Sequence, residues 1–350
     1  MKIIVAMSGG IDSAVAAYLL RKWGNEVTGV FYKLSESPRE DEKRCCDYDS
    51  VNKLSKLLSI KIETIDIHNE FQSEIVEDFL SSYKNGTTPN PCTLCNEKIK
   101  FGLGLKRAQE IIGNYPFATG HYAVIEKENN RFHLKKALDK DKDQSYMLWR
   151  LTKDSLSKII LPLGNYTKTE VRNIAKDFNM PPKRESQDIC FINGTLRNFL
   201  EEHFGKAKGK VVDTKGQVLG EHSGAYLYTI GQRSGLNIPY EYPLYVVGID
   251  VSDNIVIVGS YDECFFDRAI IKDLNVLEDW NGESIHLKGK IRYRSKESDV
   301  ILKKEGEYAS AEFTAPQFAV TPGQSLVLYK DDYLFAGGTI MKAFRRNPDS

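Results

Sequence analysis

Two hydroxyls, a carboxylate and two glycines stand together near the start of the chain. The residues Ser8–Ser13 read SGGIDS and directly follow the apolar run Ile3–Met7. Paired glycines let a backbone approach an anion closely, and a helix that begins behind them presents unpaired N–H groups. The hydroxyls of Ser8 and Ser13 can donate to phosphate oxygens. Asp12 is unexpected beside an anion unless a metal ion or a catalytic step uses it. No lysine follows the glycines, so the loop is a phosphate cradle of a different kind from G-x-x-x-x-G-K-[ST].

A second reactive stretch lies at Pro89–Phe101, which contains a C-x-x-C spacing. Its prolines predict an extended loop, and Asn96 predicts the start of a helix that ends near Gly113. Cys95 would then stand just before a helix. The helix dipole and Lys98 would favour its thiolate, so the sequence predicts a reactive thiol.

The same spacing has other uses. Zinc, iron–sulfur clusters and redox thiols all use C-x-x-C, and Cys45 and Cys46 could join Cys92 and Cys95 as metal ligands. A further cysteine, Cys190, lies between apolar residues, where a lone cysteine is usually inert and buried. The residues alone leave these alternatives open.

Alternating strands and helices must position these groups. Apolar runs at Val27–Tyr32, Ile60–Ile67 and Phe117–Ala118 read as buried strands between helical patterns. This rhythm predicts an α/β fold with a doubly wound parallel sheet, in which ligands bind at the carboxyl ends of strands. Both the first loop and Gly120-His121 would lie there.

The pattern changes after about Gly205, where strand-like pieces are separated by turn residues. After about Phe265 it becomes wholly β, which predicts a small barrel. We therefore expect three domains, at residues 1–204, 205–266 and 267–350: an α/β domain that carries the first loop, a small central domain and a C-terminal β-barrel.

Composition limits the class of protein. The 350 residues are 41% hydrophobic and 27% charged, with zero formal net charge. No signal peptide or membrane-spanning stretch is present in the sequence, so we expect a cytoplasmic protein with no membrane partner. Six cysteines then indicate thiol chemistry or metal binding rather than a disulfide framework. Basic residues alternate along Lys288–Lys296, which would place the cations on one face of a strand. Such a face could contact the phosphate backbone of a nucleic acid or only be solvated.

Several short motifs, in their order, resemble those of the bacterial tRNA-specific 2-thiouridylases, a family in the ATP-pyrophosphatase superfamily. SGGxDS is the pyrophosphate loop of that superfamily. Each other motif is weak alone, but the ordered set is specific and covers nearly the whole chain. The motifs are N-P-C-x-x-C-N-x-x-I-K-F from Asn90, A-T-G-H-Y from Ala118, K-D-Q-S-Y from Lys142, S-Q-D-I-C-F-I from Ser186, G-Q-R from Gly231 and T-P-G-Q-S from Thr321.

The resemblance implies ATP-dependent adenylation of C2 of the wobble uridine in tRNA, followed by replacement of its oxygen with sulfur. It implies that Cys190 carries a persulfide and that Cys95 is a nucleophile that releases sulfide or forms a disulfide with Cys190. Asp12 would act with ATP and Mg²⁺. A cysteine desulfurase or sulfur-relay protein would supply the sulfur. An iron–sulfur cluster is the less favoured alternative, and no metal ligands are assigned.

The resemblance also implies two sets of binding residues. ATP contacts are expected from Ala6, Met7, Ser8, Gly9, Gly10, Ile11, Asp12, Ser13, Tyr32 and Gly120. Contacts to tRNA are expected from Asn90, Pro91, Cys92, His121, Lys142, Asp143, Gln144, Arg292, Tyr293 and Gln324.

Three positions depart from the pattern of many relatives. Tyr32 replaces Met, Cys92 replaces Asp, and Gln187-Asp188 replace Thr-Gly.

Synthetases that adenylate a carbonyl and then admit an amine are the nearest rival enzymes, and they need no distant pair of reactive cysteines. A non-catalytic tRNA- or metal-binding module is the rival from another class, although Asp12, Cys95 and Cys190 are all present.

Overall fold

The computed structural model describes residues 1–35, 48–181 and 189–345. Contacts divide the chain into two compact units. The first unit comprises Met1–Val76, Pro91–Phe191 and Asp331–Phe335, and the second comprises Glu77–Asn90, Ile192–Lys330 and Ala336–Ser350. The segment at residues 77–90 thus packs with later parts of the chain, whereas the sequence places it inside the first expected domain.

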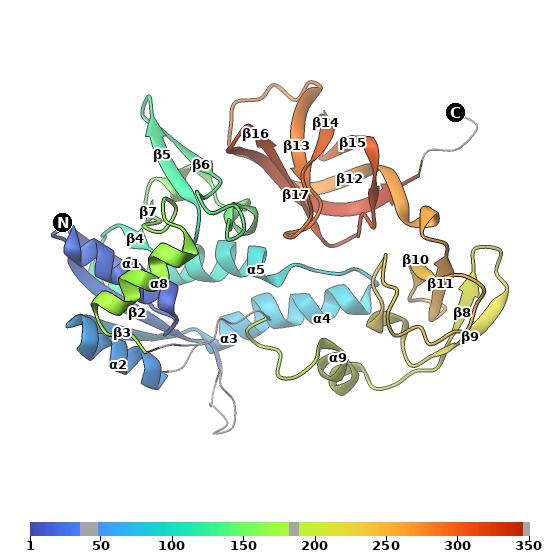
Figure 1. The fold of residues 1–350 in the computed structure, drawn as a ribbon, viewed down its shortest axis with the longest axis horizontal. Helices are drawn as coiled ribbons and strands as arrows, with labels where there is room; N and C mark the ends of the chain where they lie inside the picture. The colour runs from blue at the N-terminus through green and yellow to red at the C-terminus, as the bar shows by residue number, and fades with distance from the viewer. Residues whose placement is uncertain (36–47, 182–188, 346–350) are drawn as a thin grey trace. The chain divides into compact units, whose positions relative to one another are not determined.

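The first unit contains a parallel sheet of order β3-β2-β1-β4-β7 (Figure 1). Its centre is buried because β1 and the facing side of α1 are almost wholly apolar. The order reverses direction between β1 and β4, which is the switch point where doubly wound sheets bind ligands. The strands are β1 (Lys2–Ala6), β2 (Glu26–Lys33), β3 (Lys61–Asp66), β4 (Phe117–Ala118) and β7 (Ile159–Ile160).

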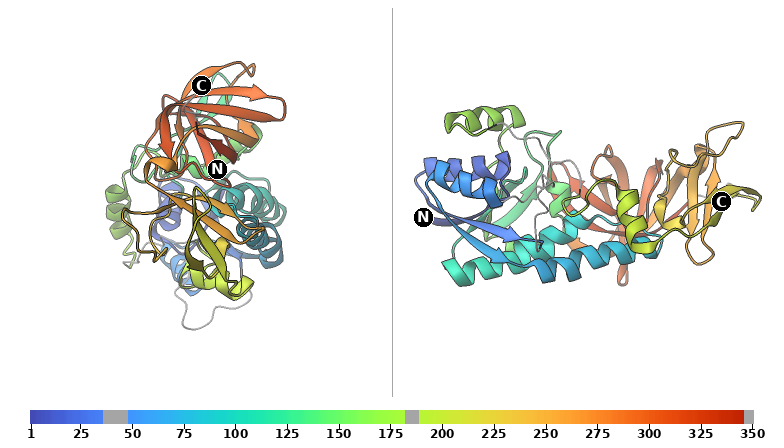
Figure 2. Two further views of the ribbon diagram at one scale, coloured as in Figure 1. Left: turned by 90° about the vertical axis from the view of Figure 1, so that its right-hand side faces the viewer. Right: turned by 90° about the horizontal axis from the view of Figure 1, so that it is seen from below.

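Helices cover both faces of this sheet (Figure 2). α1 (Ile11–Lys22), α2 (Tyr48–Leu58) and α8 (Lys168–Asp177) supply residues to one core with β1. The other face is covered by one continuous helix, made of α5 (Pro91–Leu94), the π-helical η2 (Cys95–Gly104) and α6 (Leu105–Ile112). The remaining elements of the unit are α3 (His68–Phe71), η1 (Gln72–Val76), η3 (Ser145–Leu148), α7 (Lys153–Leu156) and the hairpin β5 (Val124–Glu128) and β6 (Arg131–Lys135).

The second unit holds a small mixed sheet and a barrel. The small sheet has the order β10-β11-β8-β9 and its own apolar core. In the barrel the order is β12-β15-β14-β13-β16-β17, and pairing of β12 with β17 closes it. The strands are β8 (Gly209–Asp213), β9 (Val218–His222), β10 (Tyr245–Asp250), β11 (Ile255–Gly259), β12 (Phe265–Val276), β13 (Ile285–Lys290), β14 (Ser298–Glu305), β15 (Tyr308–Phe318), β16 (Ser325–Lys330) and β17 (Tyr333–Phe344), and the helices are α4 (Glu77–Lys84), α9 (Leu196–Phe204), η4 (Ala225–Leu227) and η5 (Asp262–Cys264).

The predicted fold class is confirmed: a doubly wound parallel sheet, a small central domain and a closed C-terminal β-barrel. Two local predictions are wrong. The helix expected from Asn96 begins at Pro91, because proline is favoured at the first helical position. The basic alternation from Lys288 does not follow one strand, because β13 ends at Lys290 and a turn follows.

Residues 77–90 are attached to the second unit by specific contacts. Phe79 packs edge-on against Phe199, with ring centroids 6.2 Å apart. Thr88 and Thr229 share a hydroxyl hydrogen bond of 3.1 Å. The Gln324 amide donates to the carbonyl oxygens of Thr88 and Pro89, at 2.9 and 3.2 Å. The connection between α4 and α5, which leads into Pro91, is therefore held by the barrel loop that contains Gln324.

Candidate active site

The loop between β1 and α1 is closed by its own serines. Ser13 Oγ accepts from the Ser8 amide at 3.2 Å and donates to the Gly10 carbonyl at 3.0 Å, and the Gly10 amide donates to Ser8 Oγ at 3.4 Å. Gly9 has a φ of 79°, a conformation that glycine adopts without strain. The serine hydroxyls thus shape the turn from within, in addition to any bond they donate to a ligand.

Gly120 brings the end of β4 against this loop. A Cβ at Gly120 would lie 2.6 Å from the Asp12 carbonyl carbon and 2.7 Å from the Ser13 amide nitrogen. Only a residue without a side chain allows this approach. The strand that follows the switch point is therefore packed directly on the first turn of α1.

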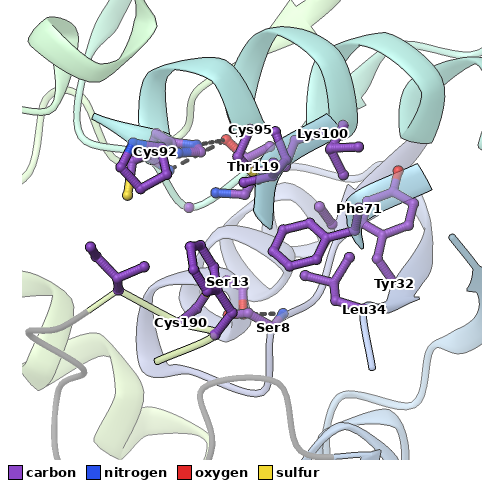
Figure 3. Close-up of a pocket in the computed structure, with 18 of the residues that line it drawn as sticks. Ser8, Ser13, Tyr32, Leu34, Phe71, Cys92, Cys95, Lys100, Thr119 and Cys190 are labelled. Atoms are coloured by element: carbon purple, nitrogen blue, oxygen red, sulfur yellow. Dashed lines mark hydrogen bonds between the residues drawn. The ribbon is translucent and has the colours of Figure 1, made fainter. Parts of the chain in front are cut away.

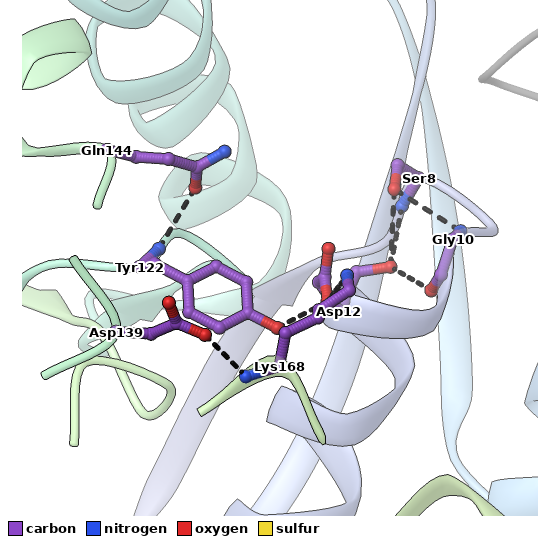
Figure 4. A network of polar contacts seen from close by, with 8 residues as sticks. Ser8, Gly10, Asp12, Tyr122, Asp139, Gln144 and Lys168 are labelled. Carbon is purple, nitrogen blue, oxygen red and sulfur yellow. Dashed lines mark hydrogen bonds and ion pairs between the residues drawn. The ribbon is translucent and has the colours of Figure 1, made fainter. Parts of the chain in front are cut away.

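The Asp12 side chain is held by two donors from distant parts of the unit (Figure 4). Its Oδ1 accepts from the Tyr122 hydroxyl at 2.8 Å and from Lys168 Nζ at 2.6 Å. The Lys168 side chain is 6% exposed and that of Asp12 is 34% exposed. Asp12 also lies in the first turn of α1, where the helix dipole favours a carboxylate. The carboxylate is thus fixed in orientation at the edge of the loop.

A cavity of about 290 Å³ opens at the switch point and lies wholly within the first unit. Its polar end has Ser8, Asp12 and Ser13, and its apolar end has Leu34, Phe71 and Ile75. Cys92, Cys95 and Cys190 also line it (Figure 3). In Figure 3 Cys92 and Cys95 lie along the helix on one side, and Cys190 lies with Ser8 on the other. The sequence-predicted ATP residues in its wall are Ala6, Met7, Ser8, Asp12, Ser13, Tyr32 and Gly120, while Gly9, Gly10 and Ile11 are not among the lining residues.

The predicted environment of Cys95 is wrong. Cys95 lies one turn inside the helix and is 7% exposed. Burial raises the pKa of its thiol to about 11, and the nearby Lys100 lowers it only in part. Lys98, which was expected to favour the thiolate, pairs instead with Glu74. The shifted start of the helix explains the difference, because it moves Cys95 from the helix end into the buried face.

Cys190 and Cys92 are both exposed, reduced cysteines. Phe191, next to Cys190, packs edge-on against Phe71 with ring centroids 5.9 Å apart. This contact fixes the segment Ile189–Phe191 at the cavity wall. Cys190 is therefore accessible, unlike the buried cysteine that its apolar neighbours suggest.

The metal alternative involves two cysteines outside the described residues, Cys45 and Cys46. Ser186, Gln187 and Asp188, which precede Cys190, also lie outside them. Within the described ranges, no three His, Cys, Asp or Glu side chains are arranged to hold a metal ion.

His121 and Gln144 join the cavity wall from the loop after β4 and from the loop before η3. His121 Nδ1 contacts Thr119 Oγ1 at 2.7 Å. Its enclosure in the wall and the Lys100 charge hold the pKa of His121 well below the ordinary value, so the ring is neutral near pH 7. Gln144 Oε1 accepts from the Tyr122 amide at 2.9 Å, and Gln144 lines the cavity.

Asp143 lies between them in sequence with a different environment. It is 6% exposed, and its carboxylate accepts from the Ala137 amide and from the Ser145 amide and hydroxyl. In this structure Asp143 orders the turn that carries Lys142 and Gln144.

Tyr32 is buried at the apolar end of the cavity. Its hydroxyl has no hydrogen-bond partner among the described residues, and burial raises its pKa. The ring lies against Gly104 of η2, where a Cβ would meet the Tyr32 hydroxyl oxygen at 2.9 Å. The Tyr32 side chain therefore closes this end of the cavity against the helix that carries the cysteines.

The remaining predicted tRNA contacts, Asn90, Arg292, Tyr293 and Gln324, belong to the second unit. Arg292 donates to the carbonyl oxygens of Phe318 and Ala319, at 3.0 and 2.6 Å. Lys288 pairs with Asp299 at 2.7 Å. Arg292 and Lys288 therefore both have partners within the barrel.

Sequence reasoning missed Lys168, Lys100 and the role of the Tyr122 hydroxyl. Tyr122 and Lys100 lie inside motifs that the sequence analysis singled out, so these motifs could have predicted that both residues lie at the site. Lys168 lies 156 residues from Asp12 and in none of those motifs, and only the packing of α8 on α1 brings the two together.

Comparison with known proteins identifies the family of the chain. Three family models match consecutive parts of the chain: a tRNA methyl transferase HUP domain at residues 1–194, a tRNA methyl transferase PRC-barrel domain at 197–260 and an aminomethyltransferase beta-barrel domain at 266–340. The tRNA-specific 2-thiouridylase MnmA 1 of Caldanaerobacter subterraneus subsp. tengcongensis is 42% identical, over 98% of this chain and 99% of its own. The chain belongs to the tRNA-specific 2-thiouridylase family.

Further members of the 2-thiouridylase family match over the same length. MnmA of Halothermothrix orenii is 43% identical, over 98% of this chain and 99% of its own. Among solved structures, the U34-tRNA thiolase NcsA from Methanococcus maripaludis is 19% identical over 58% of this chain and 65% of its own, with a TM-score of 0.36. The predicted family resemblance is confirmed by the full-length relatives. No helix in the described ranges is long and apolar enough to cross a membrane.

Proposed function

We propose that this protein catalyses ATP-dependent 2-thiolation of the wobble uridine of tRNA, with AMP and pyrophosphate as by-products. Membership of the 2-thiouridylase family supports the reaction. The observation that carries the proposal is one cavity lined by a phosphate-type loop and by three cysteines. Adenylation needs the first feature and sulfur transfer needs the second, and the cavity brings them together in the first unit.

ATP would bind with its phosphates at the polar end of the cavity. Ser8, Asp12 and Ser13 line this end beside the N-terminus of α1, where unpaired backbone amides favour an anion, and Gly120 packs against the same turn. Leu34, Phe71 and Ile75 give an apolar surface of the kind that a nucleobase stacks on. We therefore place adenine at the apolar end, next to Tyr32.

The donor set at the polar end fits Mg²⁺. Asp12 presents a partly exposed carboxylate, and Ser8 and Ser13 line the same end of the cavity. Oxygen ligands of this type are those that Mg²⁺ prefers, so Asp12 would hold the ion. When bound, Mg²⁺ neutralises charge on phosphate oxygens. Ser8 and Ser13 would orient the phosphates beside it.

Sulfur transfer follows adenylation. A persulfide on Cys190 would attack C2 of the adenylated uracil, and AMP would leave with the original oxygen. The Cys95 thiol would then cleave the remaining S–S bond, which gives 2-thiouridine and a Cys95–Cys190 disulfide that an external thiol reduces. Alternatively, Cys95 attacks the persulfide first and releases sulfide as the nucleophile. Because Cys95 is buried as a neutral thiol, either route needs a change at Cys95 when tRNA binds.

We further propose that tRNA is bound by residues of both units. In the first unit they are Pro91, Cys92, His121, Lys142, Asp143 and Gln144, and in the second unit they are Asn90, Arg292, Tyr293 and Gln324. A cysteine desulfurase or a sulfur-relay protein would load Cys190, which is exposed to such a donor. With tRNA as its substrate, the protein would act in the cytoplasm.

Two cysteine variants test this proposal. Cys190→Ser should consume ATP in the presence of tRNA, make no 2-thiouridine and accept no labelled sulfur from a cysteine desulfurase. Cys95→Ser should retain label on Cys190 and stall before release. Cys264→Ser is the matched control, because Cys264 is a buried cysteine of the second unit and should be dispensable. Thiolation by both single variants with free sulfide would contradict the persulfide route.

A further inference from the structure

Lys168 is a buried cation at the edge of the phosphate loop. It is 5% exposed, and its ammonium lies 2.6 Å from Asp12 Oδ1. The same ammonium lies 5.5 Å from the centre of the Tyr122 ring, whose hydroxyl also contacts Asp12 (Figure 4). A lysine is rarely buried unless it is paired, so the ion pair with Asp12 accounts for this position.

The backbone of Lys168 is fixed as firmly as its side chain. It is the first residue of α8, whose Thr167 and Glu170 form a reciprocal capping box. Its amide donates to Asp139 Oδ2 at 2.8 Å. α8 shares a core with α1, so the ammonium is held in register with the loop. The position of the ion pair is therefore fixed by the packing and capping of α8.

Charge explains what the pair does. Asp12 is partly exposed in the wall of the cavity, so an uncompensated carboxylate would repel a polyphosphate in the adjacent loop. We propose that Lys168 is a positioning residue for the adenylation step, which orients Asp12 and offsets its charge so that the loop accepts the phosphates of ATP. The inference rests on the proposed ATP site.

The role of Lys168 is the same throughout the step. The uridine O2 attacks the α-phosphorus, the bond between that phosphorus and the bridging oxygen breaks, and pyrophosphate leaves with the electron pair. Lys168 gives up no proton. Its ammonium stays paired with Asp12 Oδ1 and holds that carboxylate in place while the leaving group gains negative charge.

Binding of inorganic pyrophosphate in EDTA, measured by isothermal titration calorimetry, tests this role without turnover or metal. Lys168→Met should weaken binding by about tenfold or more, since it leaves Asp12 uncompensated. Asp12→Asn should strengthen binding, and Asp12→Asn/Lys168→Met should return close to wild type. Lys158→Met is the matched control, because it breaks a surface pair with Asp154 in the same unit and should have no effect.

The outcomes separate the two proposals. Equal binding by wild type and Lys168→Met would overturn the role of Lys168 and leave the ATP site in place. Absence of pyrophosphate binding by every variant, with or without Mg²⁺, would remove the polyphosphate site itself. A double variant that binds as weakly as Lys168→Met, with a wild-type melting curve, would mean that charge compensation is not the cause. Circular dichroism melts check the fold, and the double variant buries no lone charge.

Discussion

The two sides of the cavity differ in whether their reactive groups are already positioned and exposed for reaction. On the phosphate side the loop is closed by its own serines, Gly120 is packed on it, and Asp12 is held by Tyr122 and Lys168. On the thiol side Cys190 is exposed, whereas Cys95 is buried with a raised pKa. A site of this kind can bind and activate before it transfers sulfur. The difference predicts an order of events, in which adenylation is prepared in advance and the second thiol becomes active only when tRNA is bound.

The strongest test of the phosphate side is Asp12→Asn. If Asp12 holds Mg²⁺ as proposed, its loss should lower AMP formation by about 1000-fold, because charge stabilisation by the ion is worth several kcal/mol. The fold and tRNA binding should remain. AMP and pyrophosphate are measured by a coupled assay in the presence of tRNA, and near wild-type release would remove Asp12 from the mechanism.

The thiol side can be tested by alkylation without tRNA. Because the pKa of Cys95 is raised to about 11, its thiolate fraction near pH 8 should be about 100-fold lower than that of an ordinary cysteine. Cys190 should therefore label first, and Cys95 should gain reactivity as the pH rises toward about 11. Peptide mass spectrometry follows each site.

Cys264 is the internal control for that measurement. It is also buried with a pKa raised to about 11 by burial, but it lies in the second unit. Addition of tRNA and ATP should accelerate labelling of Cys95 and not of Cys264. If Cys95 labels as fast as Cys190 before tRNA is added, the two sides do not differ in readiness.

Gly120→Ala tests whether the close packing of Gly120 on the phosphate loop is needed for ATP binding. A new Cβ would press on the backbone of Asp12 and Ser13, and overpacking of this kind costs about 1–3 kcal/mol. ATP affinity should fall by a similar free energy, and cysteine labelling should not change. Gly220→Ala is the control, because its Cβ would meet only the Ile238 side chain, at 3.3 Å.

Tyr122→Phe should have the smallest effect. It removes one donor to Asp12 while Lys168 remains, so the loss should be about 1 kcal/mol, or about fivefold in the rate of adenylation. Tyr228→Phe provides a buried tyrosine control in the second unit, where the hydroxyl contacts the Gly235 carbonyl at 3.4 Å. A loss equal to that of Asp12→Asn would mean that Tyr122, not Lys168, holds the carboxylate.

Features encoded by adjacent residues could be predicted from the sequence. The Ser8–Ser13 loop needs only a strand, two glycines and a helix start, and its position at the switch point follows from the strand pattern. The burial of Cys95 could not be predicted, because it depends on a helix that begins at Pro91 and on the residues packed against it. Lys168 could not be predicted because nothing near it in sequence indicates a partner 156 residues away. The end of β13 at Lys290 likewise depends on pairing within the barrel.

The contacts of residues 77–90 with the second unit affect which fragments of the protein keep an ordered site. A fragment that ends after α9, at the predicted limit of 204, would keep the contact of Phe79 with Phe199 but lack Thr229 and Gln324, which bond to Thr88. The segment that leads into Pro91 would lose these hydrogen bonds, although every residue of the cavity wall would be present. Cloning the first 204 residues should therefore give a fragment with a complete list of site residues and a poorly fixed entry to Pro91. The barrel is a structural partner of this segment, in addition to any role in binding RNA.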